Sequence, residues 1–317
     1  MERVLAECVA RSLPVLITVP LDVQTAIAAA PILPTAPTLS ARPALNPSSL
    51  AALASAVAAR LASASSPVVL VGAGVGRAPS APAALAALLS KLNLPAAVVA
   101  DGRALVDETG PFCLGVYGGD RSFPPSCRET VDASDCVLRL GVRLTDVTTG
   151  GFTAAIQHES GDRVVSLDIC SAVICGTVFE GGVPLAAALD AIAKAAAPRS
   201  EAAARSYWRP RADNVVAPRN ARDIKRSSAH IGGTESAAAA AAARAPLRVD
   251  DVLDGLSGLL RPGDVLVVET CCAAFGLFTR TLPPGVTAVS QEQFGSIGCA
   301  QKKSITESWV SDSLNCL

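Results

Sequence analysis

The chain has 317 residues, enough for one large or two ordinary domains, and half of them are hydrophobic, which suffices for a substantial core. Basic and acidic residues nearly balance at a formal net charge of −1, so charge gives no general argument for binding nucleic acid or membranes. No apolar run reaches the roughly 18 residues that a bilayer-spanning helix needs, and we expect a cytoplasmic protein.

The first 30 residues contain an apolar run that superficially resembles a secretion signal. Glu2 and Glu7 lie where such a signal carries basic residues, which argues against that interpretation. We instead predict that Leu13–Val19 forms a buried strand ending at Pro20. Residues 31–47 are rich in proline, and we predict an extended linker there.

Strands and helices alternate from residue 48 to about residue 196. The predicted strands are the continuous apolar run Pro67–Val71 and the segments Ala96–Ala100, Cys136–Leu140, Arg163–Asp168 and Val173–Cys175. The predicted helices are Ser48–Ala62, Pro82–Leu92 and Pro184–Ala195. Strands this apolar are usually buried on both faces, so we predict an α/β domain with a doubly wound parallel sheet over residues 48–196.

Residues 197–246 differ in composition from the preceding domain. They contain nine Lys or Arg, four Asp or Glu, and the alanine run Ala237–Ala243, and we predict an exposed linker between domains. An RNA-binding arm is the alternative, with only Tyr207 and Trp208 as stacking rings, and we expect no nucleic-acid partner.

A second α/β unit is predicted to begin after this linker. Val249–Leu260 has the apolar spacing of an amphipathic helix, and Asp264–Val268 is a further apolar strand. Roughly 70 remaining residues are too few for a complete doubly wound domain. We therefore predict a truncated second unit at residues 247–300, followed by an unrelated tail at residues 301–317.

The ten cysteines give no indication of a metal site. No two of them form a CxxC pair, and the chain has only two histidines, whereas zinc sites need closely spaced ligands. We predict buried, reduced thiols and assign no metal ligand.

Gly72-Ala-Gly74-Val-Gly76 follows a predicted strand, and Asp101 ends the next one, which imitates a dinucleotide-binding motif. The third glycine comes one residue early, and Pro79 and Pro82 delay the helix that should face a phosphate. We favour a tight structural turn and keep a nucleotide-binding module as an alternative.

Asp107–Gly119 is a glycine-rich segment that indicates an ordered loop. Its adjacent carboxylates, Asp107 and Glu108, are either an acid/base pair or turn and cap residues, and we favour the latter.

Three segments, Asp107–Gly119, Ser134–Gly141 and Leu144–Phe152, closely resemble the middle domain of thiamine-diphosphate-dependent pyruvate and indolepyruvate decarboxylases. Leu13–Val23 resembles the end of that family's pyrimidine-binding domain. Glu269-Thr270 and Gln291–Gly298 resemble the start of its diphosphate-binding domain. The resemblance implies a pyrimidine-domain remnant at residues 1–30, a Rossmann-like central domain at residues 48–196 and the start of the diphosphate-binding domain at residues 247–300.

The resemblance also implies cofactor contacts. Thr270 matches a threonine near the diphosphate, and the carbonyl of Gly295 matches an acceptor for the aminopyrimidine. Ser296 belongs to the same turn, and Ile297 matches the apolar wedge that bends the cofactor, a form of catalysis by orientation. Because the family's middle domain holds no catalytic residue, we assign none to this chain.

The chain departs from the family at several positions. Cys271 and Cys272 replace a glycine and a small polar residue, and the family's catalytic glutamate and its Gly-Asp-Gly motif for Mg²⁺ have no counterpart. The family implies thiamine diphosphate and Mg²⁺ as cofactors and the non-oxidative decarboxylation of a 2-oxo acid to an aldehyde and CO₂. We expect this chain to be a fragment that is inactive alone. The alternative is a non-catalytic partner that forms a hetero-oligomer with an intact relative. Whether the chain forms homo-oligomers or hetero-oligomers stays open at this point.

Overall fold

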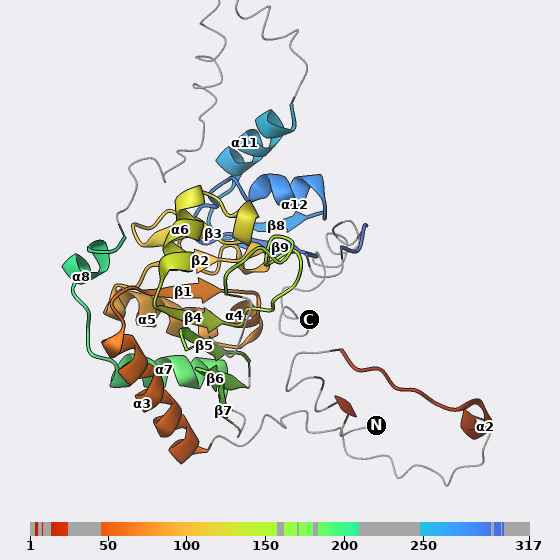
Figure 1. The fold of residues 1–317 in the computed structure, drawn as a ribbon. Helices are drawn as coiled ribbons and strands as arrows, with labels where there is room; N and C mark the ends of the chain where they lie inside the picture. The colour runs from red at the N-terminus through yellow and green to blue at the C-terminus, as the bar shows by residue number, and fades with distance from the viewer. Residues whose placement is uncertain are drawn as a thin grey trace, which may run out of the picture.

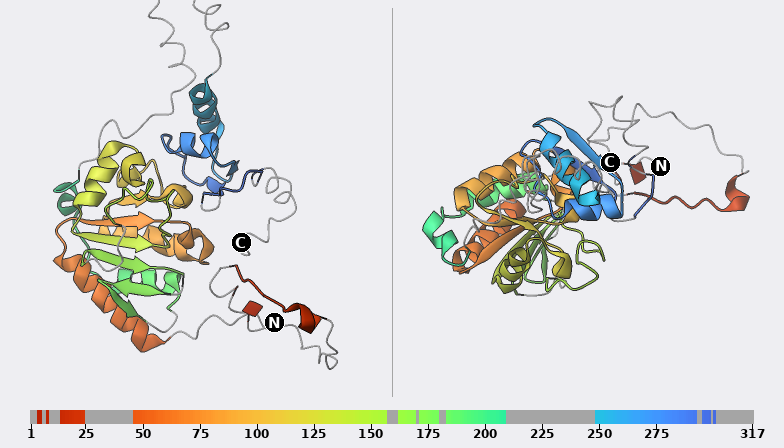
Figure 2. Two further views of the ribbon diagram at one scale, coloured as in Figure 1. Left: turned by 45° about the vertical axis from the view of Figure 1, so that its right-hand side comes forward. Right: turned by 90° about the horizontal axis from the view of Figure 1, so that it is seen from above.

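The computed structural model describes residues 4–5, 8, 14–24, 46–156, 162–169, 171–179, 183–208, 248–292, 295–298 and 300. Within residues 46–208 they form one α/β body, which we call the central domain, and within residues 248–300 they form a smaller body, the second unit (Figure 1). The second unit lies beside the β2–β3 half of the central sheet, and Figure 2 shows this arrangement from two further directions.

The central domain is built on a seven-stranded sheet in the order β3-β2-β1-β4-β5-β6-β7. Its strands are β1 (Pro67–Val71), β2 (Ala96–Val98), β3 (Cys113–Val116), β4 (Cys136–Leu140), β5 (Val164–Leu167), β6 (Ala172–Ile174) and β7 (Thr177–Phe179). Its helices are α3 (Pro47–Ser63), α4 (Gly74–Arg77), α5 (Ala81–Leu92), α6 (Pro125–Ala133), α7 (Leu185–Ala195) and α8 (Glu201–Arg205), with 3₁₀ turns η1 (Ala100–Gly102) and η2 (Gly119–Arg121).

The sheet is mixed, and this corrects one part of the fold prediction. Strands β3, β2, β1, β4 and β5 are parallel neighbours, which confirms the predicted α/β architecture. Strands β6 and β7 are antiparallel to their neighbours, although the sequence predicted a parallel sheet throughout. The short link from Leu167 to Ala172 explains the difference, because a parallel crossover needs a dozen or more residues.

Both faces of the central sheet are covered by helices. Alternate residues of β1 point to opposite faces, so Val69 and Val71 pack with α3, α5 and α7, whereas Val68 and Leu70 pack with α6 and Trp208. The first helix, α3, begins where the side chain of Asn46 accepts from the backbone N–H of Ser48 at 3.1 Å, with proline at its first position.

Two regions outside the core of the central domain differ from expectation, one before it and one at its C-terminal end. The segment Pro14–Pro20 is not a buried strand: it is irregular and exposed, with Leu16 91% exposed, and none of the described strands pairs with it. A strand is stable only beside another strand, which explains this error. A four-residue helix, α2 (Leu21–Gln24), follows directly.

The second correction concerns residues 199–208, which were predicted to be irregular and exposed. Helix α8 lies there, Trp208 is 5% exposed, and Tyr207 donates its hydroxyl to the carbonyl of Pro67 at 2.8 Å. The basic composition of residues 197–246 as a whole did not indicate that Tyr207 and Trp208 pack against the central domain. The rest of the predicted linker, residues 209–247, and the tail at 301–317 lie outside the described residues.

The second unit contains α11 (Val249–Leu259), β8 (Val265–Val268), α12 (Cys272–Leu277) and β9 (Thr287–Ser290). Strands β8 and β9 form a parallel pair joined through α12, which confirms the predicted start of a second α/β unit. Its buried cluster is small: Leu253, Leu266, Val268, Ala274, Leu277, Leu282 and Val286.

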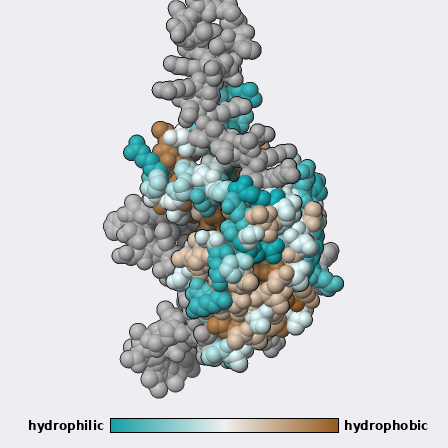
Figure 3. All heavy atoms as spheres, turned by 90° about the vertical axis from the view of Figure 1, so that its left-hand side faces the viewer, coloured by the Kyte–Doolittle hydropathy of each residue, from teal (hydrophilic) through white to brown (hydrophobic). Residues whose placement is uncertain are grey.

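The surface of the central domain mixes polar and apolar side chains on the face drawn in Figure 3. Across the described residues, no helix is both long enough and apolar enough to cross a membrane.

Candidate cofactor-binding site

The second unit brings two of the predicted cofactor residues together. Thr270 directly follows Glu269 after β8, and Gly295 lies on the turn that follows β9. A Cβ atom added to Gly295 would lie 3.9 Å from the hydroxyl oxygen of Thr270, and the left-handed φ of +57° at Gly295 suits a glycine. The side chains of Ser296 and Ile297 on the same turn are exposed, Ile297 at 83%.

Glu269 ties this turn to the end of β8, a function that no sequence pattern indicated. Its Oε1 atom accepts from the N–H of Thr270 at 3.0 Å. Its Oε2 atom accepts from the N–H groups of Gly298 at 3.0 Å and Ala300 at 3.2 Å. A carboxylate that accepts several backbone N–H groups fixes their relative position, so Glu269 holds Thr270 and the Gly295–Gly298 turn as one edge. We call Thr270 and residues 295–297 the candidate edge.

The candidate edge has the chemistry to bind one side of a polar, ring-containing ligand. A threonine hydroxyl donates to phosphate oxygens, a backbone carbonyl accepts from an amino group, and an exposed isoleucine offers an apolar surface to a ring. Among the described residues no group of three or more His, Cys, Asp or Glu side chains is arranged to hold a metal ion.

The switch point of the central sheet is closed by the chain itself. Gly74 donates its N–H to the carbonyl of Gly141 at 2.9 Å, across the crevice between β1 and β4. A Cβ atom at Gly72 would lie 2.5 Å from the oxygen of Gly141. Open α/β sheets bind ligands in this crevice, and here the glycines serve close backbone packing. Asp101 accepts from the N–H of Ala73 at 3.3 Å and supports the same turn.

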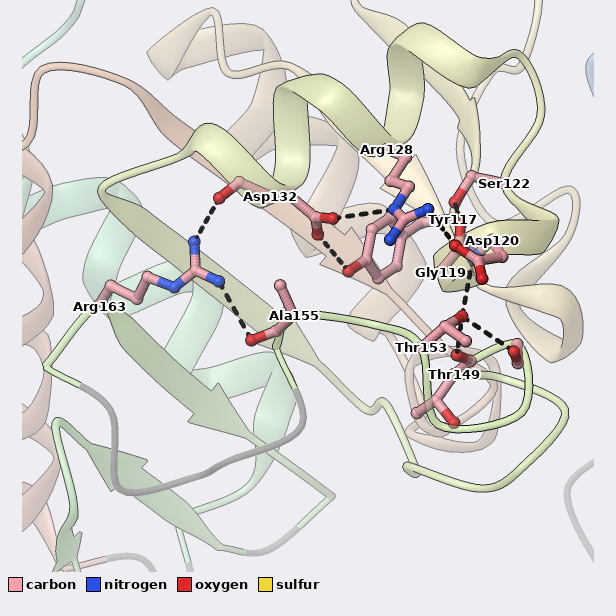
Figure 4. Close-up of polar contacts among 12 residues, drawn as sticks. Tyr117, Gly119, Asp120, Ser122, Arg128, Asp132, Thr149, Thr153, Ala155 and Arg163 are labelled. Atoms are coloured by element: carbon pink, nitrogen blue, oxygen red, sulfur yellow. Dashed lines mark hydrogen bonds and ion pairs between the residues drawn. The ribbon is translucent and has the colours of Figure 1, made fainter.

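The two glycine-rich segments that carried the family resemblance pack directly on each other. A Cβ atom at Gly150 would lie 1.9 Å from the carbonyl oxygen of Gly118, and the N–H of Asp120 donates to the hydroxyl of Thr153 at 2.8 Å. Figure 4 shows how polar side chains continue this contact. The two segments, Asp107–Gly119 and Leu144–Phe152, therefore pack against each other as one unit.

The polar network in Figure 4 centres on Asp132 of α6. Tyr117 donates its hydroxyl to Asp132 at 2.6 Å, and Arg128 bridges Asp132 and Asp120. Arg163 donates to the backbone carbonyl of Asp132 at 2.7 Å. Burial, and then the bond to Asp132, raises the pKa of Tyr117, so this hydroxyl stays protonated and acts as a donor. The network supports loops and offers no general base.

The buried cysteines have low reactivity. Burial raises the pKa of Cys113 to about 12 and that of Cys136 to about 11, and it raises the pKa of Cys127 well above its usual value. Thiols of this kind remain protonated and are weak nucleophiles. In contrast, Cys271 and Cys272 are exposed, and all seven cysteines in the described part of the chain are free.

The carboxylates Asp107 and Glu108 have separate functions. Asp107 accepts from the N–H of Thr109 at 3.0 Å, the turn interaction that was favoured from sequence. Glu108 is buried and forms an ion pair with Arg103 that faces the second unit. The pair Asp107–Glu108 is therefore not arranged as two cooperating acid/base groups.

Comparison with known proteins agrees with this geometry. Residues 54–196 match the family described as thiamine pyrophosphate enzyme, central domain. Residues 54–196 thus resemble the central domain of thiamine pyrophosphate enzymes, and the relatives to which the chain is similar are 2-oxo acid decarboxylases. It is 29% identical over 211 residues to pyruvate decarboxylase isozyme 1 of Saccharomyces cerevisiae, covering 67% of this chain and 32% of that protein.

Two further relatives are similar over a comparable extent. Pyruvate decarboxylase of Candida albicans is 27% identical over 238 residues, covering 75% of this chain and 37% of that protein. An alpha-keto-acid decarboxylase of Mycobacterium avium is 27% identical over 214 residues, covering 68% of this chain and 33% of that protein. The chain thus spans about a third of the length of these decarboxylases.

The backbone of Cys271 has an unusual conformation. Its φ of +69° and ψ of −131° lie in a region that glycine adopts readily and a residue with a Cβ atom adopts at a cost. This agrees with the glycine that the sequence resemblance implies at this position.

Proposed function

We propose that this chain serves a thiamine-diphosphate-dependent decarboxylase of 2-oxo acids, supplying its central domain and one edge of its cofactor site. The observation that carries the proposal is the candidate edge, where Thr270 and Gly295 lie side by side and are tied together by Glu269. The relatives named pyruvate decarboxylase and alpha-keto-acid decarboxylase support a 2-oxo acid, such as pyruvate or indolepyruvate, as the substrate class.

Each residue of the candidate edge has a proposed contact. The hydroxyl of Thr270 donates to the diphosphate, and the carbonyl of Gly295 accepts from the aminopyrimidine. Ser296 shapes the turn, and the exposed side chain of Ile297 supports the bend between the two rings. When bound, thiamine diphosphate supplies the ring that stabilises the negative charge left by departing CO₂.

We further propose that the chain is inactive alone. Magnesium requires several fixed oxygen ligands around the phosphates, and the residues of this sequence do not include the family's motif for it. Proton transfer by a positioned acid contributes about 10²–10⁴-fold in rate, and the matching glutamate is likewise missing. Decarboxylation then requires residues beyond those of this sequence that supply both. We propose that the decarboxylation takes place in the cytoplasm, where reduced thiols are usual.

The test combines calorimetry with an activity assay. Purified chain is titrated with thiamine diphosphate and Mg²⁺, and is assayed with pyruvate and with indolepyruvate. We expect neither saturable micromolar binding nor turnover above a protein-free control, and we expect turnover after adding an isolated pyrimidine-domain chain together with the part of a relative's diphosphate-binding domain that follows the candidate edge. Ile297→Ala should abolish that restored turnover. Activity of the chain alone, once mass spectrometry excludes a full-length contaminant, would contradict the proposal.

One observation favours a second candidate, a non-catalytic partner of an intact relative. Helices cover both faces of the central sheet, so this domain buries its own core and can present its outer surface to a partner. Native mass spectrometry of the chain mixed with an intact relative would reveal a hetero-oligomer. A nucleotide-binding module gains no support, because Gly141 occupies the crevice beside Gly72 and Gly74.

A further inference from the structure

A buried ion pair on the central domain faces the second unit. Arg103 and Glu108 lie between β2 and β3, and their side chains are 6% and 5% exposed. Arg103 donates from Nε to Oε1 of Glu108 at 2.8 Å and from Nη2 to Oε2 at 2.7 Å. This two-pronged arrangement fixes the orientation of both side chains.

The same two side chains reach across to the second unit. Arg103 donates from Nη1 to the carbonyl of Leu277 at 2.7 Å and from Nη2 to the carbonyl of Arg280 at 2.6 Å. Glu108 accepts from the N–H of Leu282 at 3.1 Å. Leu277 is the last residue of α12, where helix carbonyls lack partners within the helix. The ion pair therefore holds the end of α12 and the segment that follows it.

Apolar and aromatic contacts surround this polar junction. Phe278 of the second unit is 8% exposed and belongs to the buried cluster of the central domain. Ala104 of the central domain packs in turn against the cluster of the second unit. The guanidinium of Arg121 lies 5.6 Å from the ring centre of Phe275. Each body thus contributes side chains to the core of the other.

The backbone at the junction is held in an unusual conformation. Ala104 has a φ of +63°, in the region that favours glycine, and its N–H donates to Oε1 of Glu108 at 2.8 Å. A non-glycine residue keeps such a conformation only when its surroundings determine it strongly. The geometry of this loop therefore depends on Glu108.

On the second unit, the junction continues to α11. Arg280, whose carbonyl Arg103 binds, donates from its own side chain to Asp254 at 3.0 Å and to Asp250 at 2.7 Å. At its other end, α12 begins immediately after Thr270 and Cys271. Because a helix moves as a rigid rod, a shift at Leu277 is transmitted to the start of α12 and to Thr270.

We propose that Arg103 and Glu108 are positioning residues that latch the second unit onto the central domain and so hold the candidate edge in place. A buried ion pair contributes little net stability, because removing both charges from water offsets their attraction, but its geometry fixes orientation. The central domain then acts as the platform that sets the place of the cofactor edge. The consequence for the cofactor rests on the proposed function, whereas the latch itself does not.

The test is hydrogen exchange measured by mass spectrometry on the full chain without cofactor, comparing Glu108→Gln with the native protein. We expect peptides covering residues 265–292 to exchange at least about tenfold faster, and peptides covering β1 and β4 to be unchanged. The control is Glu201→Gln, which removes the exposed ion pair with Arg205 and should change neither region. Unchanged exchange in residues 265–292, or an equal increase in β1 and β4, would overturn the latch.

A second variant covers the case in which Glu108→Gln fails to fold. Arg103→Lys keeps the charge, but the three donors on its one nitrogen cannot reproduce the four hydrogen bonds that Arg103 makes from Nε, Nη1 and Nη2. Spin labels attached by non-cysteine chemistry at Asp190 on α7 and Gly255 on α11 then report the relative position of the two bodies. A broadened distance distribution in Arg103→Lys supports the latch, and an unchanged narrow one contradicts it. Because both measurements omit the cofactor, their failure leaves the proposed function untouched.

Discussion

The central domain and the second unit are both α/β structures, but they differ in how much of their own sheet they bury. In β1, Val68, Val69, Leu70 and Val71 are all at most 1% exposed, because helices cover both faces. In β8, Val265 is 45% exposed and Leu266 is 8% exposed, beside a single partner strand. Three or more strands are usually needed for an independently stable sheet. The second unit therefore depends on its neighbour for a defined structure, whereas the central domain does not.

The largest expected effect compares one leucine from each sheet. Leu138→Ala in β4 removes a fully buried side chain and should lower the free energy of unfolding of the central domain by about 2–5 kcal/mol. The matched change, Leu266→Ala in β8, should leave the unfolding of the central domain unchanged and loosen only the second unit. Urea unfolding followed by far-UV circular dichroism measures the first effect. A comparable loss from both variants would show that the two bodies unfold together.

A smaller effect concerns pH and the cavity between the two bodies. Glu292 of the second unit is 4% exposed and lines this cavity with Asp101 and Arg103. Burial, and then the charge of Asp101, raises the pKa of Glu292, while Ser290 and Arg103 oppose the shift. Because the folded state binds this proton more tightly than the unfolded state, docking is most favourable at low pH and weakens as pH rises through the raised pKa.

Glu292→Gln should remove this dependence, since glutamine resembles the protonated acid. As pH rises from about 4.5 through the raised pKa of Glu292, the native second unit should lose stability relative to the variant. Limited proteolysis of the second unit below and above that pKa, with cleavage rates corrected against an unfolded peptide, measures the difference. Parallel pH profiles for the two proteins would contradict the assignment.

The smallest effect tests the backbone strain at Cys271. Cys271→Gly should stabilise the second unit by about 0.5–1 kcal/mol, because glycine adopts the φ of +69° without a Cβ penalty. The matched control is Cys272→Gly at the first position of α12, where glycine gains nothing and lowers helix propensity. Amide exchange in α12 distinguishes the two variants. Equal behaviour would mean that the conformation at Cys271 carries no strain.

Sequence patterns predicted the strands with strong local character. Pro67–Val71 and Cys136–Leu140 were predicted with the bounds that the structure has, because continuous β-branched and leucine-rich runs are typical of buried parallel strands. Strand β3, Cys113–Val116, was predicted as loop because glycines surround it and one, Gly115, lies within it. The strand predicted at Leu13–Val19 had the right composition, but composition cannot supply a neighbouring strand.

The candidate site was predictable only through resemblance. Thr270 and Gly295 are 25 positions apart, and no spacing rule connects them. The long-range contacts of Glu269 and Glu108 were missed because those partners lie 29 to 31 and 174 positions away, respectively. A carboxylate that organises distant backbone has no local pattern, so it becomes visible only once the chain is folded. Asp107 was interpreted correctly because its partner, Thr109, is only two residues away, and a contact this local does follow a sequence pattern.

Hydrogen exchange of the unmodified chain, resolved to single amides by NMR, tests the contrast between the two bodies most directly. In β1 and β4 we expect exchange only through global unfolding, so protection should be uniform and should follow the unfolding free energy as urea is added. In β8, β9 and α12 we expect exchange through local undocking, with protection at least about tenfold lower and nearly independent of low urea concentrations. Equal protection in both bodies, with the same dependence on urea, would contradict the account.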